Sequence, residues 1–206
     1  MADKPIIFSA PMVRALLEGR KTQTRRVVRQ PDVDAGQHWH RYPAGWFMID
    51  AEDAYLAKTP YQTGDRLYVR EQCATWTGTI TDVAYRADET EGEWENLKHD
   101  AGLGFWKMRP SIHMPRWASR LTLTVTDVRV QRLQDISEAD AMAEGVDAVT
   151  MDDVPRQAAM SRRSDFAALW NSLHGPEAWD ANPWVAAYTF RPVLGNIDML
   201  AERARQ

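Results

Sequence analysis

A short cationic segment, residues 19–26, holds the residue types best suited to chemistry in this 206-residue chain. It reads Gly-Arg-Lys-Thr-Gln-Thr-Arg-Arg, so it combines one lysine, two threonine hydroxyls and three arginines. Such a segment is suited to binding an anion or activating a hydroxyl, and poorly suited to a protein core. Arg25 and Arg26 could bind phosphate, and we expect one of the two to have a structural role instead. For Arg26 the partner would be a carboxylate such as Asp65 or Glu71.

A predicted helix positions the start of this segment. Ser9 can cap the helix, Pro11 lies in its first turn, and apolar residues then recur at helical spacing. Gly19 ends the helix immediately before the cationic residues. Because Lys21 and Thr24 follow this helix end directly, we expect neither to contribute much to core packing.

The remaining elements predict an α+β protein. Strands and short helices follow one another without a regular βαβ order, which favours a small mixed β-barrel. The clearest strand spans residues 120–132, and Ser137 begins a short helix that Gly145 ends. We expect residues 31–60 to form a long insertion or an ordered loop, and the acidic residues 88–104 to be the most mobile segment. Further strands are predicted from residue 27 and at 64–71, 83–86 and 183–192, and further helices around 166–173 and 198–206.

Composition limits the class of protein. Hydrophobic residues make up 44% and charged residues 26%, as in a soluble globular protein. The length predicts one domain with insertions, or one domain and a half. No apolar run approaches the roughly 20 residues of a membrane helix, and the N-terminal residues do not have the pattern of a signal peptide. The single cysteine, Cys73, excludes an internal disulfide and fits a reducing compartment, so we expect a cytoplasmic protein.

The charge distribution favours a small ligand. The net charge of −4 argues against a protein that coats nucleic acids. Bases dominate residues 14–29, whereas acids dominate residues 88–100. A local basic site on an acidic protein suits a small anionic or nucleotide-like ligand better than a long duplex. The alternative is that both stretches are simply solvated surface.

The pattern Gly-x-Lys-x-x-Thr-x-Arg, at Gly19, Lys21, Thr24 and Arg26, resembles the signature of the ASCH domain family, whose fold is PUA-like. The order of predicted elements, with Thr-Gly-Asp at 63–65 before a strand, resembles the family's layout along most of the chain. The resemblance implies a small PUA-like mixed β-barrel with flanking short helices and long insertions. This layout has one domain at 1–195, insertions near 31–60, 86–118 and 146–180, and a polar tail at 196–206.

The cationic segment is most similar to that of the small bacterial family members that hydrolyse N4-acetylcytidine, where it also reads Gly-Arg-Lys-Thr-x-Thr. Those enzymes use a lysine, a threonine and a glutamate. The lysine and threonine match Lys21 and Thr24. Their glutamate lies in the short helix after the long strand, which corresponds to Glu144, with Glu138 as the main competitor. The resemblance implies an amidohydrolase that acts on N4-acylated cytosine nucleosides or a related modified base.

Amide hydrolysis gives these residues roles, since it needs a nucleophile, a base and an acid for the leaving nitrogen. Lys21 would activate the hydroxyl of Thr24, provided that burial and the neighbouring arginines lower the lysine pKa from about 10.4 toward neutrality. Glu144 would protonate the departing amine, which requires an apolar pocket. Trp76 and Trp117 would stack on the cytosine ring of the substrate. The expected substrate-binding residues are Arg20, Thr22, Arg25, Arg26, Trp76 and Trp117. Each of the three catalytic candidates has a simpler alternative as an ordinary solvated or strand-forming residue.

Other functions stay open. Residues 110–120, 133–137 and 182–185 resemble stretches common in ASCH-type phage and prophage proteins of mostly unassigned activity, which implies a bacterial host cell. The chain could therefore be a PUA-like module that binds single-stranded RNA or a modified nucleotide, a nuclease, or a phage accessory protein whose insertions bind another protein. We expect no cofactor and no metal. A zinc site built from the candidate ligands lacks paired cysteines to support it. These candidates are His38, His40, Cys73 and His113.

Overall fold

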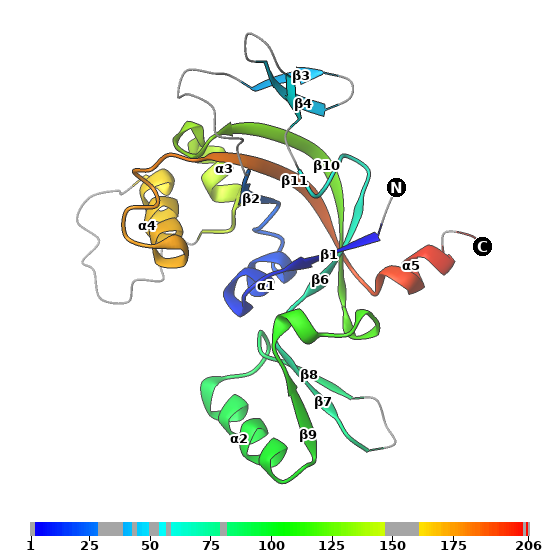
Figure 1. Cartoon of the computed structure of the whole chain (residues 1–206). Coiled ribbons are helices and arrows are strands. Elements are labelled where there is room, and N and C mark those ends of the chain that lie inside the picture. Colours follow the sequence, from blue (N-terminus) through cyan, green and yellow to red (C-terminus); the bar gives the residue numbers. More distant parts are fainter. Residues whose placement is uncertain are drawn as a thin grey trace. The chain divides into compact units, whose positions relative to one another are not determined.

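The chain folds into eleven strands and five α-helices in the part that the computed structural model describes, which is residues 3–28, 39–42, 45–49, 54–56, 59–78, 82–146, 161–203 and 205 (Figure 1). The strands are β1 (Asp3–Ile7), β2 (Gln23–Val27), β3 (Trp39–Tyr42), β4 (Gly45–Ile49), β5 (Ala54–Leu56), β6 (Arg66–Arg70), β7 (Cys73–Trp76), β8 (Val83–Tyr85), β9 (Trp106–Arg109), β10 (Leu121–Arg132) and β11 (Trp184–Leu194). The α-helices are α1 (Ala10–Leu17), α2 (Glu91–Gly102), α3 (Glu138–Ala143), α4 (Arg162–His174) and α5 (Ile197–Arg203).

The strands form one five-stranded mixed sheet, in the order β1-β6-β10-β11-β2, and two three-stranded antiparallel sheets, β3-β4-β5 and β8-β7-β9. Within the large sheet β1 pairs with β6 in parallel, whereas β6–β10 and β2–β11 are antiparallel pairs. The predicted α+β class is therefore confirmed. No closed barrel is present among the described strands.

The chain divides into two compact units. Unit 1 comprises Met1–Gly19, Gly64–Thr124 and Arg191–Gln206, and unit 2 comprises Arg20–Thr63 and Val125–Phe190. The predicted layout of one domain with insertions stays a prediction. None of the described helices is both long enough and apolar enough to cross a membrane.

In unit 1 the predicted first helix is confirmed as α1. Ser9 is its N-cap, Pro11 lies in its first turn, and Val13 and Leu16 are buried. Gly19 follows the C-cap with a φ of +73°, the left-handed conformation in which helices commonly end and which glycine adopts without strain. The end of α1 is thus set by the sequence position of this glycine.

The acidic segment of unit 1 contains a helix that was not predicted. Residues 91–102 form α2, and Thr90 and Glu93 make a reciprocal capping box at its start. The mobility of residues 88–104 stays a prediction. Trp94 is 1% exposed, and the guanidinium of Arg86 lies 5.7 Å from its ring centroid. Trp94 is therefore the buried residue that holds α2 in place, and the other residues of this helix are exposed or half-buried.

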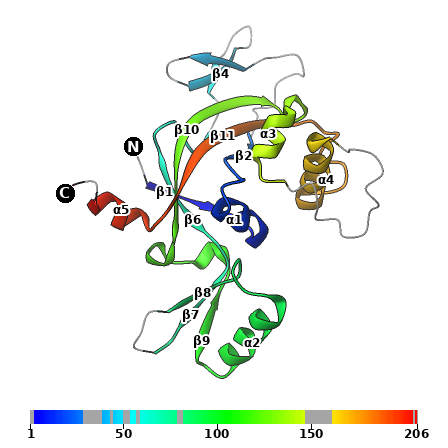
Figure 2. The ribbon, with the colours of Figure 1, turned by 180° about the vertical axis from the view of Figure 1, so that it is seen from behind.

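Unit 2 contains the helices α3 and α4. Helices α3 and α4 lie side by side in both views (Figures 1 and 2). Leu133 and Ile136 form a core with Phe166 and Trp170 of α4 and Val185 of β11. This core fixes α3 against the strands that carry the cationic segment.

The described parts of the 31–60 segment include the strands β3, β4 and β5, so the ordered-loop alternative is wrong there, and the insertion stays a prediction. The indole N–H of Trp46 donates to the main-chain oxygen of Val128 at 3.1 Å, which links β4 to β10. Other predicted elements are confirmed within a few residues. These are β6, β8, β10, β11, α4 and α5.

We predict that Gly19→Ala lowers the free energy of unfolding by about 1 kcal/mol, because alanine is strained at a φ of +73°. Gly92→Ala in α2 is the matched control, since an added Cβ meets nothing within 4 Å at either glycine. The control should be neutral or stabilising by about 0.5 kcal/mol, because alanine favours helix. Urea denaturation of both variants measures the difference. Equal stabilities would show that the left-handed turn at residue 19 is dispensable.

Candidate functional site

Three buried charges meet at the end of α3 in unit 2. The Lys21 ammonium donates to Glu144 Oε2 and to the Glu144 main-chain oxygen, both at 2.8 Å. The Arg25 guanidinium donates to Glu144 Oε1, also at 2.8 Å. Lys21 is 2%, Arg25 3% and Glu144 4% exposed. Accepting hydrogen bonds from two cations is the arrangement of an ionised carboxylate, so the cluster is an ion triple. The prediction that Lys21 and Thr24 contribute little to the core is wrong, since each is 2% exposed.

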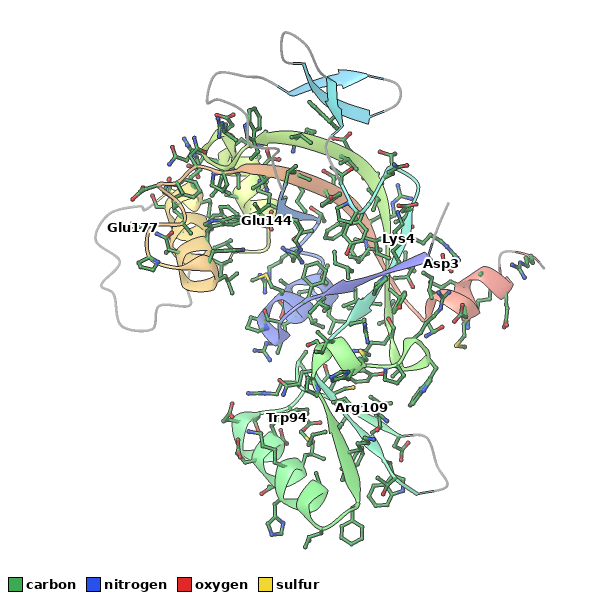
Figure 3. The ribbon with its side chains drawn as sticks, in the orientation of Figure 1. Asp3, Lys4, Trp94, Arg109, Glu144 and Glu177 are labelled. Carbon is green, nitrogen blue, oxygen red and sulfur yellow. The ribbon has the colours of Figure 1, made fainter. Side chains whose placement is uncertain are left out.

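Backbone geometry brings the two halves of the triple together. Glu144 is the C-cap residue of α3, and Gly145 follows with a φ of +78°. Lys21 and Glu144 form an antiparallel β-bridge, and the N–H of Thr22 donates to the carbonyl of Ala143 at 2.8 Å. Figure 3 shows Glu144 beside the strands of unit 2. The segment after α1 therefore pairs with the end of α3 through both main chain and side chains.

Asp140, one turn before Glu144, extends the network. Its carboxylate accepts from Gln23 Nε2 at 2.8 Å and Arg129 at 3.1 Å, and lies 3.3 Å from the Arg25 guanidinium. Partial burial acts to raise the pKa of Asp140, but these hydrogen bonds and the arginine charges lower it overall. The second carboxylate thus helps to balance the cations of β2.

Lys21 has the electrostatic environment that a lysine base needs. Burial is the largest influence and lowers its pKa, since the charged form loses its hydration. Glu144 opposes this by attraction and hydrogen bonding, whereas the charges of Arg26 and Arg25 add to the lowering. The net direction is downward, as the sequence predicts.

The pleat of β2 separates the cationic segment into two faces. Gln23 and Arg25 point toward Asp140 and Glu144. Thr24 and Arg26 point to the other face, where the Arg26 guanidinium donates to Thr24 Oγ1 at 3.1 Å. The backbone N–H of Thr22 donates to the carbonyl of Ala143, and the carbonyl of Thr22 accepts from the N–H of Phe190. The regular alternation of side chains between the two faces begins at Gln23, where β2 starts.

Two tyrosines that the sequence did not single out lie on the Thr24 face. Tyr188 of β11 is the register partner of Thr24, so both side chains are on the same face of the sheet. The ring of Tyr61 makes an edge contact with Tyr188, with 5.2 Å between centroids. Burial raises the pKa of both phenols, and the charge of Arg26 opposes the rise at each. The only sequence signal for Tyr188 was its position in the predicted strand at residues 183–192.

The structure distinguishes the two candidate glutamates. Glu138 lies exposed in the first turn of α3, and its carboxylate accepts the backbone N–H of Arg162 at 2.7 Å. This contact caps the start of α4. Glu144 is therefore the carboxylate in contact with Lys21.

The other predicted substrate-binding residues divide between the units. Arg20 donates to the carbonyl of Gly145 at 3.2 Å, and Thr22 is half-buried beside the bridge. Arg25 has the structural role that was expected of one arginine. Trp76 and Trp117 belong to unit 1 and are not part of this cluster.

The described residues contain no group of three or more histidine, cysteine or acidic side chains arranged to hold a metal ion. His38 lies outside the described residues, as does the side chain of His40. The family models contain no match to this chain, and neither the curated proteins nor the solved structures contain one.

We predict that Glu144→Gln lowers the free energy of unfolding by about 3–5 kcal/mol, because it leaves Lys21 and Arg25 buried without their shared counter-charge. The matched variant Glu138→Gln should lose less than about 1 kcal/mol, since an exposed amide oxygen can still accept the Arg162 N–H. Chemical denaturation of the two variants tests this. Similar losses would contradict a buried ion triple at Glu144.

Proposed function

We propose that this chain is an ASCH-type amidohydrolase that removes the acyl group from N4-acylated cytosine nucleosides or a related modified base. One observation carries the proposal. The Lys21 ammonium and the Glu144 carboxylate, 123 positions apart in sequence, lie 2.8 Å apart and are buried. They are two of the three catalytic residues that the resemblance implies, and Thr24 is the third. The proposal includes a PUA-like fold, with the five-stranded sheet as the main part of its mixed barrel.

In the proposed reaction the Thr24 oxygen attacks the acyl carbon while neutral Lys21 takes the hydroxyl proton through a bridging water, because Thr24 lies on the face of β2 away from Glu144. The lowered pKa of Lys21 supports this role, because a base must be partly deprotonated at the working pH. Collapse of the tetrahedral intermediate breaks the bond between the acyl carbon and N4, and Lys21 returns the proton to the leaving nitrogen. Water then hydrolyses the acyl-threonine with Lys21 again as base, which releases the carboxylic acid.

Glu144 has a different role in this scheme from the one first expected. Both of its carboxylate oxygens accept hydrogen bonds from cations, so it is poorly placed to donate a proton. It instead holds the Lys21 ammonium by attraction and hydrogen bonding. Glu144 is therefore proposed to position the base, and Lys21 delivers the proton.

We predict that Thr24→Val lowers kcat for N4-acetylcytidine hydrolysis at least about a hundredfold, because valine keeps the shape of threonine but has no nucleophilic oxygen. Thr24→Ser, which keeps the hydroxyl, should retain measurable turnover. Chromatographic detection of cytidine provides the assay.

Thr122→Val is the matched structural control, since Thr122 is also a buried strand threonine and its hydroxyl donates to the Gly195 carbonyl at 2.9 Å. It should lose stability and keep kcat. Wild-type protein without hydrolysis, or a Thr24→Val variant with normal kcat, would contradict the proposal.

The RNA-binding alternative requires arginines that can reach phosphates. Arg25 is buried and paired with Glu144 and Asp140, which leaves Arg20 and Arg26 of the three arginines considered. Two phosphate contacts give a log–log salt slope of about −1.4 for single strands. We therefore predict weak binding of a labelled single-stranded oligonucleotide, with a slope no steeper than this. Tight binding with a slope of about −3 would favour the RNA-binding function.

A further inference from the structure

The hydroxyl of Tyr188 is a buried polar group without a hydrogen bond. Tyr188 is 0% exposed, and its oxygen has no hydrogen-bond partner in the described part of the chain. The backbone of Tyr61 is near enough to act on the phenol and opposes the rise in its pKa. Leaving such a group unsatisfied costs about 1–3 kcal/mol, so its retention needs an explanation.

The surroundings of this hydroxyl indicate what it could bind. Tyr188 faces the same side of the sheet as its register partner Thr24, and Arg26 is two residues along on that face. Arg26 is near enough to Lys21, Tyr61 and Tyr188 to influence the pKa of each. The Arg26 guanidinium thus contacts the Thr24 hydroxyl, and its charge acts on the two phenols and on the lysine. Donors gathered around a nucleophilic oxygen are suited to an acceptor oxygen on the group that it attacks.

We propose that the Tyr188 hydroxyl and the Arg26 guanidinium form a binding site for an acceptor oxygen beside Thr24. This inference deepens the proposed function and rests on it for the reaction. The site would take the acyl oxygen of the substrate, stabilise the negative charge on it when Thr24 attacks, and then hold a carboxylate oxygen of the released acid. Arg26 and Tyr61 are half-buried, whereas Thr24 and Tyr188 are buried.

The test compares two tyrosine-to-phenylalanine variants. Tyr188→Phe removes only the unpartnered hydroxyl, so the free protein should melt at the same temperature or higher. Tyr85→Phe is the matched control in unit 1, because its hydroxyl donates to the Ala118 carbonyl at 2.8 Å. The control should melt at a lower temperature. A lower melting temperature for Tyr188→Phe would show that its hydroxyl has a partner within the fold and would overturn the proposal.

Acetate binding tests the site without requiring turnover. Sodium acetate is titrated against sodium chloride at equal ionic strength, and binding is followed by NMR. Wild type and Tyr85→Phe should bind acetate with the same apparent Kd, and Tyr188→Phe should bind at least about tenfold more weakly, as expected for a lost hydrogen bond to a charged group. Acetate binding that does not depend on Tyr188, or no acetate binding by wild type, would overturn the proposal.

Hydrolysis of N4-acetylcytidine tests the catalytic part. Tyr188→Phe should lower kcat by about 100- to 1000-fold, the usual effect of removing one oxyanion donor, while Tyr85→Phe should not. Normal kcat in Tyr188→Phe would overturn the oxyanion role and leave the amidohydrolase function standing. If acetate binding depends on Tyr188 but wild type hydrolyses no acylated cytosine nucleoside, the proposed function fails and the acceptor-oxygen site stands.

Discussion

The buried ion triple of Lys21, Glu144 and Arg25 is the interaction on which the architecture of unit 2 depends. Removing an ion from water costs several kcal/mol, and attraction offsets this only where geometry is good and the remaining hydrogen bonds are made. Here the carboxylate accepts at 2.8 Å on both oxygens, and the lysine also donates to the main chain of the same glutamate. A small shift of α3 against β2 would therefore expose the full desolvation penalty. This requirement fixes the register between two segments that are far apart in sequence.

The position of the triple explains the two glycines that border it. Gly19 ends α1 two residues before Lys21, and Gly145 ends α3 immediately after Glu144, each with a positive φ. Each glycine reverses the chain at a helix end without strain, so Lys21, two residues after Gly19, and Glu144, directly before Gly145, can form the bridge. The local helix-ending signals and the long-range ion pair therefore specify the same geometry, which is the consistency expected of a sequence that encodes one fold.

Features written in local patterns could be predicted from the sequence, whereas features that depend on distant partners could not. The first helix, the long strand β10 and the cap at Ser137 follow from residues within a few positions of each other. The burial of Lys21 did not follow, because a cationic segment enters a core only when a carboxylate from elsewhere compensates its charge. Tyr188 was not singled out, because cross-strand register decides which side chain faces Thr24.

Because side chains alternate along β2, Gln23 and Arg25 lie on one face of the strand, whereas Thr24 and Arg26 lie on the other. On one face, Gln23 and Arg25 donate hydrogen bonds to the carboxylates of Asp140 and Glu144 and so stabilise the fold. The Thr24 and Arg26 face contains a hydroxyl, a guanidinium and a phenol without a structural hydrogen bond. Arg26 links the faces electrostatically, since its charge lowers the pKa of Lys21 and opposes the raised pKa of both tyrosines. A positive charge in that position disfavours protonated lysine and favours negative charge on a neighbouring oxygen, and an attack by Thr24 requires both effects.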